Sequence, residues 1–329
     1  MRIAVDGMGG DRAPRAIVEG AVLAAREYEY ELILVGDKTT LRGELSRHRR
    51  YPDNITVQHA SEVVTMDEPP AISIRRKRNS SISVAMELVK KGEADAFISA
   101  GNTGAVVCAA TLNLGLLPGI ERPGIAIVFP TFSGLSMLID VGANIDPKPM
   151  HLLHYGIMGD AYSKFILGKP RPNIGLLSIG EESTKGTDFV KLTHKLLEDS
   201  RLNFVGNIEG RDVFTGRCDV ILCDGFVGNI VLKVAEGIGA AITKLVKAQI
   251  KHRPVAKLGA FLSKPTFMRL WRDLDYTEYG GAPLLGIDGH VIISHGSSTE
   301  KAIKNAIRRG AEFKENELNK HIVEEIESY

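Results

Sequence analysis

The sequence predicts one large α/β domain of three layers, in which a mostly parallel sheet lies between two layers of helices. Three observations predict this fold. Short apolar, β-branched runs recur along the 329 residues, and each is followed by a glycine-rich turn and a segment of helical periodicity. Several runs are apolar at successive positions, as expected of strands covered on both faces. No repeat or polar linker divides the chain, so we expect residues 1–329 to form a single domain.

The strand candidates are short runs rich in valine, isoleucine and leucine. They are residues 3–5, 32–35, 55–57, 96–98, 125–128, 137–139, 175–177, 203–205 and 220–222. The turn at residues 130–134 joins two of them directly, without the helix that a parallel crossover requires. We therefore expect an antiparallel hairpin there, and a sheet that is mixed at that point.

Capping residues and prolines mark the starts of several helices. Three helices are predicted from such starts: 15–27 after Asp11 and Pro14, 82–91 after Ser80 and Ser81, and 150–167 after Asp146 and Pro147. These helices are expected to cross from one parallel strand to the next.

One region departs from this alternation of strand and helix. Residues 229–252 form a long helical pattern whose apolar positions are broader than a lone surface helix needs. After Pro254, residues 255–271 interleave bulky apolar side chains with arginine and lysine, which is typical of a basic amphipathic helix. We expect the two segments to form a helical hairpin, at about residues 229–275, that projects from the sheet.

The hairpin allows two roles for each of its segments. The first helix is either a dimerisation element or an ordinary cover for the core. The second segment is expected to face a membrane surface or an acyl chain, because bulky apolar groups and lysines share one short stretch. The residues expected to make these contacts are Val255, Leu258, Phe261, Leu262, Phe267 and Met268.

Composition limits the classes of partner. Hydrophobic residues make up 44% of the chain, and the formal net charge is +1. That balance gives no basic field, so we expect no nucleic-acid partner. The apolar stretch at 227–246 carries Lys233, Glu236 and Lys244, which argues against a membrane span. No signal-peptide pattern precedes the first strand-like run, and we expect a cytoplasmic protein.

The sequence indicates neither a cofactor nor a metal. Its three cysteines form no disulfide framework and no C-x-x-C pair. His151 and His154 lie three residues apart on a predicted helix, but no cysteine or carboxylate partner is expected near them as a further ligand. No glycine motif matches the dinucleotide fingerprint or the Walker A pattern. We therefore expect a site that works without cofactor or metal.

Glycine-rich turns follow several of the predicted strands. They occupy residues 6–11, 99–104, 140–144, 180–186 and 224–229. In a parallel sheet such turns gather at the carboxyl edge, where glycine lets backbone N–H groups approach a ligand and helix N-termini favour an anion. We expect the active site at that edge.

The polar groups of these turns, with a serine-rich segment near the C-terminus, suit a small oxyanion. Amides, hydroxyls and one lysine can bind phosphate, or the oxyanion of a thioester under attack. The residues expected to bind phosphate or thioester are Gly101, Asn102, Thr103, Gly104, Asp140, Asn144, Gly228 and Ser297, with Ser298 beside the last of them.

The expected catalytic residues are Lys185, Asn229, Asp224 and His295. Lys185 is the only cation in the strand-end turns, so we expect it to bind phosphate, unless it is a solvated loop lysine. His295 either bonds phosphate or protonates a leaving thiolate, unless it is a structural cap. No G-x-S-x-G elbow is present, which disfavours an acyl-serine intermediate.

Several long strings occur in the order found in one known family. They are residues 4–11, 99–105, 140–144, 224–229, 279–282 and 294–297. On these strings the chain resembles the bacterial acyl-[acyl-carrier-protein]:phosphate acyltransferases of phospholipid synthesis, over nearly its whole length. The first string has Gly7 where the family commonly has alanine, which is a small change.

The resemblance implies a three-layer fold like those of phosphotransacetylases and isopropylmalate-type dehydrogenases, a homodimer, and reversible peripheral association with the cytoplasmic membrane. It also implies a reaction in which inorganic phosphate attacks the thioester of a long-chain acyl carrier protein and gives acyl phosphate. Lys185 and Asn229 would then orient phosphate, because a bound nucleophile needs positioning more than deprotonation.

Two other functions stay open from the sequence. A short-chain phosphotransacetylase that uses coenzyme A would share the glycine turns, but would have no use for the hairpin. A membrane-recruited scaffold would keep the hairpin, but would not need the polar turns. The basic run at residues 75–78 is either a solvated helix approach or a docking patch for an acidic protein.

Overall fold

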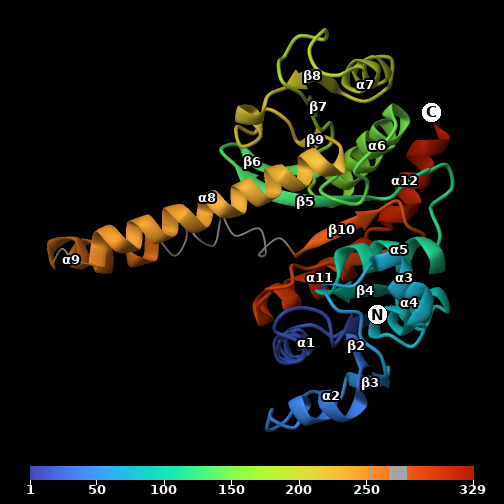
Figure 1. The fold of residues 1–329 in the computed structure, drawn as a ribbon, viewed down its shortest axis with the longest axis vertical. Coiled ribbons are helices and arrows are strands. Elements are labelled where there is room, and N and C mark those ends of the chain that lie inside the picture. Colours follow the sequence, from blue (N-terminus) through green and yellow to red (C-terminus); the bar gives the residue numbers. More distant parts are fainter. Residues whose placement is uncertain (252–253, 267–279) are drawn as a thin grey trace.

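The computed structural model of the protein describes residues 1–251, 254–266 and 280–329. In these residues eleven strands form one sheet, in the order β3-β2-β1-β4-β11-β10-β5-β6-β9-β7-β8 (Figure 1). The strands are β1 (Arg2–Asp6), β2 (Glu31–Gly36), β3 (Ile55–His59), β4 (Ala96–Ser99), β5 (Gly124–Thr131), β6 (Gly134–Ile139), β7 (Ile174–Leu177), β8 (Phe204–Ile208), β9 (Val220–Leu222), β10 (Ala282–Leu285) and β11 (His290–Ile293). All the predicted strands are confirmed, and β10 and β11 are additional.

The sheet has two parallel halves that run in opposite directions. One half holds β3, β2, β1, β4 and β11, and the other holds β6, β9, β7 and β8. Between them, β10 pairs antiparallel with both β11 and β5, and β5 pairs antiparallel with β6. The predicted hairpin and the mixed, mostly parallel sheet are thereby confirmed.

The reversal of strand direction corrects one expectation. The glycine-rich turns do not gather at a single carboxyl edge. The turns at 6–11 and 99–104 follow strands of one half, whereas those at 140–144, 180–186 and 224–229 follow strands of the other half. Because the halves run in opposite directions, the two sets of turns point in opposite directions, and they approach one another where the halves meet.

Helices cover both faces of the sheet, which confirms the three layers. One face packs against α1 (Arg15–Glu27), α2 (Lys38–Leu45), α6 (Pro149–Phe165), α7 (Asp188–Glu198), α11 (Glu300–Glu315) and α12 (Leu318–Glu327), and the other against α3 (Pro70–Arg76), α4 (Ser81–Lys90) and α5 (Thr103–Asn113). In β1, Ile3 and Val5 belong to the first apolar cluster and Ala4 to the second. The predicted helices at 15–27, 82–91 and 150–167 correspond to α1, α4 and α6.

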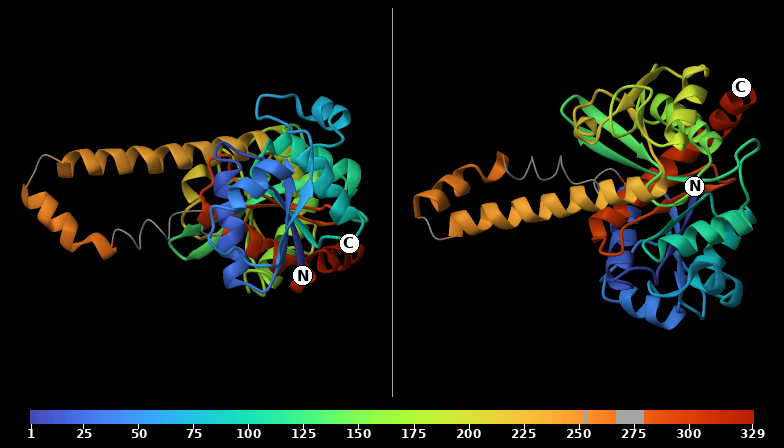
Figure 2. Two further views of the ribbon diagram at one scale, coloured as in Figure 1. Left: turned by 90° about the horizontal axis from the view of Figure 1, so that it is seen from below. Right: turned by 45° about the horizontal axis from the view of Figure 1, so that its top comes forward.

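The predicted hairpin consists of α8 (Gly225–Lys251) and α9 (Pro254–Leu262), and it projects far from the sheet (Figures 1 and 2). The α9 residues expected to contact a membrane or an acyl chain are strongly exposed, from 62% at Leu258 to 84% at Val255, with Phe261 and Leu262 between them. The other two expected contacts, Phe267 and Met268, lie outside the described residues.

Length and composition alone would allow α8 to cross a membrane. Its most apolar 18-residue window has a mean hydropathy of 1.4 and no more than two charged residues. The charged residues of the segment therefore do not exclude a span on composition, contrary to the expectation from the sequence. The side chains of Lys233 and Glu236 nevertheless line a cavity in the body of the protein, so the first turns of α8 lie against the sheet.

Candidate active site

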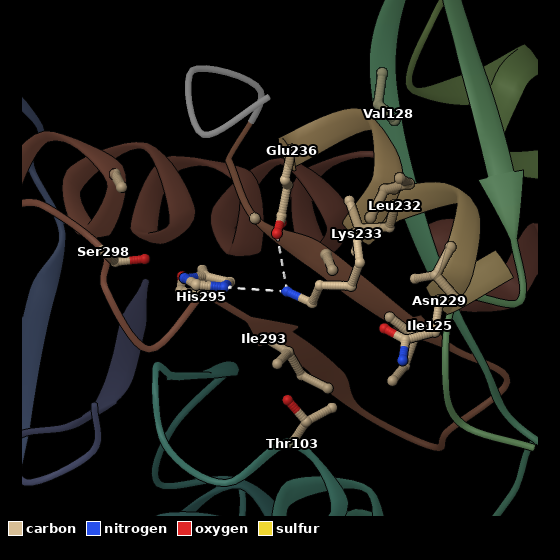
Figure 3. A pocket seen from close by; sticks show the side chains of 16 residues that line it. Thr103, Ile125, Val128, Asn229, Leu232, Lys233, Glu236, Ile293, His295 and Ser298 are labelled. Atoms are coloured by element: carbon tan, nitrogen blue, oxygen red, sulfur yellow. Dashed lines mark hydrogen bonds and ion pairs between the residues drawn. The ribbon is translucent and has the colours of Figure 1, made fainter. Parts of the chain in front are cut away.

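A cavity of about 150 Å³ lies where the two halves of the sheet meet (Figure 3). Its walls come from the first turn of α5, the first half of β5, the loop after β11 and the second and third turns of α8. Thr103 and Asn229, which follow strands of the two different halves, both reach it. The polar residues that line the cavity are Thr103, Asn229, Lys233, Glu236, Ser294, His295 and Ser298.

Lys233 brings a positive charge to this cavity. Its Nζ lies 2.9 Å from Oε2 of Glu236 and 3.3 Å from Nε2 of His295. Dashed lines mark both contacts in Figure 3. Sequence reasoning did not select Lys233 as a site residue. The available signal was its spacing, since residues four apart on a helix share a face and Asn229 stands four positions earlier on α8.

His295 lies between Lys233 and Ser297. Its Nδ1 is 2.7 Å from Oγ of Ser297, and its Nε2 faces the ammonium of Lys233. Because a charged ammonium can only donate, Nε2 accepts from it, and the neutral ring then donates its Nδ1 proton to Ser297 Oγ. The Ser297 N–H also lies 3.2 Å from Nδ1, but it can donate there only if the ring proton is on Nε2 instead. When the ring proton is on Nδ1, Nε2 has no proton to give to a leaving group.

Two serines of the lining have buried hydroxyl groups with no partner. Ser294 and Ser298 are each 5% exposed, and no group among the described residues forms a hydrogen bond with either Oγ. A buried hydroxyl without a partner costs on the order of 1–3 kcal/mol. An oxyanion in the cavity would accept from both. Ser298 therefore lines the site, while the expected Ser297 contacts His295 instead.

Two helix N-termini also face the cavity. Thr103 is the first residue of α5, and Ala302 in the first turn of α11 belongs to the lining. Each helix is capped by the residue before it, Asn102 for α5 and Thr299 for α11. Backbone N–H groups at helix N-termini favour a bound anion. The cavity thus combines a cation, several hydroxyls and two positive helix ends.

Asp140, expected to bind phosphate or thioester, has a structural role instead. Its side chain is fully buried, and its Oδ1 accepts from the N–H groups of Ile125, Gly142 and Ala143. Its Oδ2 accepts from the N–H of Asn144 at 2.7 Å. Burial raises the pKa of Asp140, although these four amides oppose the shift. The carboxyl group holds the turn after β6 in place and leaves no atom for a ligand.

The other predicted residues around the start of α8 also shape the backbone. Asn144 donates to the carbonyl oxygen of Pro123 and to the hydroxyl of Tyr155. Asp224 accepts from the N–H of Val227 in the first turn of α8. A Cβ atom at Gly228 would lie 1.9 Å from the backbone oxygen of Asp140, so the close approach of α8 to this turn requires glycine.

The turn after β4 is held in a similar way. Asn102 accepts from the N–H of Ala105 and donates to three backbone carbonyl groups, those of Thr65, Met66 and Glu68. Gly101 donates to Oγ of Ser99, and a Cβ atom at Gly104 would lie 2.6 Å from Pro70. These residues place Thr103 at the cavity, and none of the three lines it.

Lys185 is not among the residues that line the cavity. It is exposed in the loop between β7 and α7, where its N–H donates to the carbonyl oxygen of Glu182 at 3.0 Å. Two strands, β6 and β9, separate β7 from β5. Of the expected catalytic residues, the structure thus brings only Asn229 and His295 into the cavity, and it favours Lys233 over Lys185 as their cation.

Comparison with known proteins identifies the family. A family model described as fatty acid synthesis protein matches residues 1–321. The chain belongs to this family. Relatives named phosphate acyltransferase include one from Pelotomaculum thermopropionicum, 52% identical over all of this chain and 96% of its own length. Others come from Desulfitobacterium hafniense, 50% identical over 99% and 98% of the two chains, and Geotalea daltonii, 48% identical over 99% and 94%.

Solved structures support the fold of this family member. A phosphotransacetylase from Streptococcus pyogenes superposes with a TM-score of 0.62 at 19% identity, over 94% of this chain and 93% of its own. A 4-hydroxythreonine-4-phosphate dehydrogenase from Klebsiella pneumoniae gives a TM-score of 0.51 at 16% identity, over 98% and 99% of the chains. The expected phosphotransacetylase-like fold is confirmed.

Proposed function

We propose that this chain is a phosphate acyltransferase, which moves a long-chain acyl group from the thioester of an acyl carrier protein to inorganic phosphate. The acyl phosphate formed would supply phospholipid synthesis. The observation that carries the proposal is the cavity in which Lys233, Asn229 and two serine hydroxyls, which have no partner among the described residues, surround one oxyanion-sized space. Relatives about half identical over the whole chain bear the name phosphate acyltransferase.

Phosphate binding uses the polar wall of the cavity. The hydroxyls of Ser294, Ser298 and Thr103 donate to phosphate oxygens, and the N-terminus of α11 adds its positive end. Lys233 supplies the formal positive charge, shared with Glu236 while the site is free of phosphate. The three hydroxyls orient the anion, and the ammonium offsets part of its charge.

Acyl transfer needs positioning more than proton transfer. A phosphate oxygen attacks the thioester carbon, the carbonyl electrons move to its oxygen, and their return breaks the C–S bond and releases a thiolate. Phosphate is already an anionic nucleophile, and an ordinary thiol has a pKa of about 8.5, so the thiolate leaves readily. Lys233 and the amide of Asn229 are placed to stabilise the charge on the carbonyl oxygen. His295 holds the Lys233 ammonium through Nε2.

The test is release of free thiol from palmitoyl-acyl-carrier protein by purified protein in the presence of phosphate. Parallel reactions contain palmitoyl-coenzyme A, acetyl-coenzyme A or no phosphate. Phosphate-dependent release from the carrier substrate supports the proposal. Release from acetyl-coenzyme A alone would favour a short-chain phosphotransacetylase, and no release from any thioester would leave a scaffold as the better account.

The hairpin supports a proposal about assembly and location. We propose a cytoplasmic homodimer that associates peripherally with the cytoplasmic membrane. Exposed apolar side chains that lie outside any cavity among the described residues follow α8 and form a surface that a second copy would cover: Ile230, Val234 and Leu245. On α9, exposed apolar residues lie beside Lys257, in the pattern of a helix that rests on a lipid surface.

Glutamine at Leu258 and Phe261 together is expected to lower binding to phosphatidylglycerol vesicles about tenfold, because both exposed side chains would lose apolar contact with lipid. Co-sedimentation of the protein with the vesicles measures the loss of binding. Phe132→Gln is the matched control, since Phe132 is 91% exposed in the turn between β5 and β6, on the sheet rather than on α9. Equal loss in both variants, or none in either, would contradict a membrane role for α9.

A further inference from the structure

A second cavity, of about 770 Å³, lies beneath α8. It separates the inner face of the helix from β5, β6 and the segment around Phe214. The lining is mostly apolar, and the rings of Phe129 and Phe214 meet edge to face in it at 5.4 Å. Large residues that line it are Ile127, Phe129, Leu138, Phe214, Val231 and Ile242. A cavity of this size lies within the range that holds ligands in proteins, and its walls suit a hydrocarbon.

This apolar cavity adjoins the polar one. Ile127, Leu232 and Glu236 line both. Oε2 of Glu236 lies 2.9 Å from Nζ of Lys233, so the boundary between the two cavities lies near the ammonium group. A ligand that spans the boundary would have a polar head among Lys233, Ser294 and Ser298 and a long apolar tail along the helix.

Small residues keep the apolar cavity open on the side of the helix. Ala235, Gly239 and Thr243 recur every four positions on α8 and all line it. A Cβ atom built at Gly239 meets no atom within 4 Å. Gly239 stands seven residues beyond Leu232, about 10 Å along the helix axis. A larger side chain at this position would enter the cavity well beyond the site of reaction.

We propose that the cavity beneath α8 binds the acyl chain of the thioester substrate. The carbonyl carbon lies at the Lys233 end, and the methylene groups run along Ala235 and Gly239 toward Thr243. The inference rests on the proposed acyl transfer and names the site that recognises the chain. It differs from the expectation that residues 255–268 shelter the chain, since these lie beyond the end of α8. A second copy of this chain is the alternative occupant, and the experiment separates the two.

Gly239→Phe is expected to lower kcat/KM for palmitoyl-acyl-carrier protein roughly tenfold or more, because a ring in the cavity excludes several methylene groups from apolar contact. The same variant should cleave butyryl-acyl-carrier protein at the wild-type rate, since a four-carbon chain ends before Gly239. Phosphate-dependent thiol release measures both. Wild-type activity on the butyryl substrate tests the acyl transfer itself, independently of where the long chain binds.

Gly237→Phe is the matched control. Gly237 lies two residues earlier on the same helix, outside the cavity lining, and its Cβ position is equally open. Phenylalanine there should leave kcat/KM unchanged for both the palmitoyl and the butyryl substrate. Equal losses on the two chain lengths in Gly239→Phe, or no loss on either, would overturn the proposal. Equal losses with a change in sedimentation coefficient would assign the cavity to a second copy.

Discussion

Replacing Lys233 by methionine is expected to lower kcat for phosphate-dependent cleavage of palmitoyl-acyl-carrier protein about 100-fold or more. The change removes the ammonium that faces His295 and Glu236, and keeps a side chain of similar length. Stability should hardly change, because the side chain of Lys233 is 52% exposed and exposed ion pairs contribute little to folding. Steady-state kinetics at saturating phosphate measures the effect, and circular dichroism checks the fold.

Lys185→Met is the matched control for this prediction. It makes the same substitution in the loop after β7, outside the cavity. Its effect on kcat should be much smaller than that of Lys233→Met. A large loss in Lys185→Met beside near-normal kinetics in Lys233→Met would restore the expectation drawn from the sequence. It would also mean that phosphate reacts outside this cavity.

The strands and the hairpin could be predicted because burial leaves a direct trace in composition. Strands covered on both faces, such as β1 and β4, are apolar at successive positions. The projecting hairpin was visible because α8 is too long and too broadly apolar for a surface helix, and Pro254 separates it from the next helical segment. Local sequence patterns were therefore sufficient to predict most of the strands and helices.

The position of the site could not be predicted in the same way, because it depends on pairing between distant strands. β10 contains Pro283, so it does not resemble a central strand, whereas the short apolar run of β11 at residues 291–293 is no weaker a signal than that of β4 and was overlooked. Yet they stand between β4 and β5 and reverse the direction of the sheet. That reversal makes the turns of the two halves point in opposite directions, and it brings Thr103 and Asn229 together where the halves meet.

Individual site residues show the same limit. Sequence reasoning assigned ligand binding to Asp140, Asn102 and Asn144, whose side chains are taken up by backbone amides and carbonyls in the structure. Turns rich in asparagine and aspartate need such groups to hold their own backbone, and sequence alone does not separate this use from ligand binding. Lys233 was not predicted as a site residue because it lies inside α8, whereas the prediction considered cations only in the turns that follow strands.

Gly228→Ala is expected to lower the free energy of unfolding by about 3 kcal/mol and to abolish most activity. The added methyl group would lie 1.9 Å from the backbone oxygen of Asp140, and 2.9 Å from Sγ of Cys223. The backbone at Asp140 cannot move aside cheaply, because four amide groups hold the carboxyl group of the same residue. The start of α8 must shift instead, and Asn229 and Lys233 shift with it.

Gly237→Ala separates this collision from the general effect of alanine in a helix. Gly237 lies in the same helix with no atom within 4 Å of its Cβ position, so alanine there should leave stability unchanged or raise it by up to about 1 kcal/mol. Thermal and urea unfolding of both variants measure the difference. If Gly228→Ala is as stable as Gly237→Ala but inactive, Gly228 acts on the ligand rather than on the packing of α8. If both variants match the wild type in stability and activity, the close contact between α8 and the turn after β6 is not what positions the site.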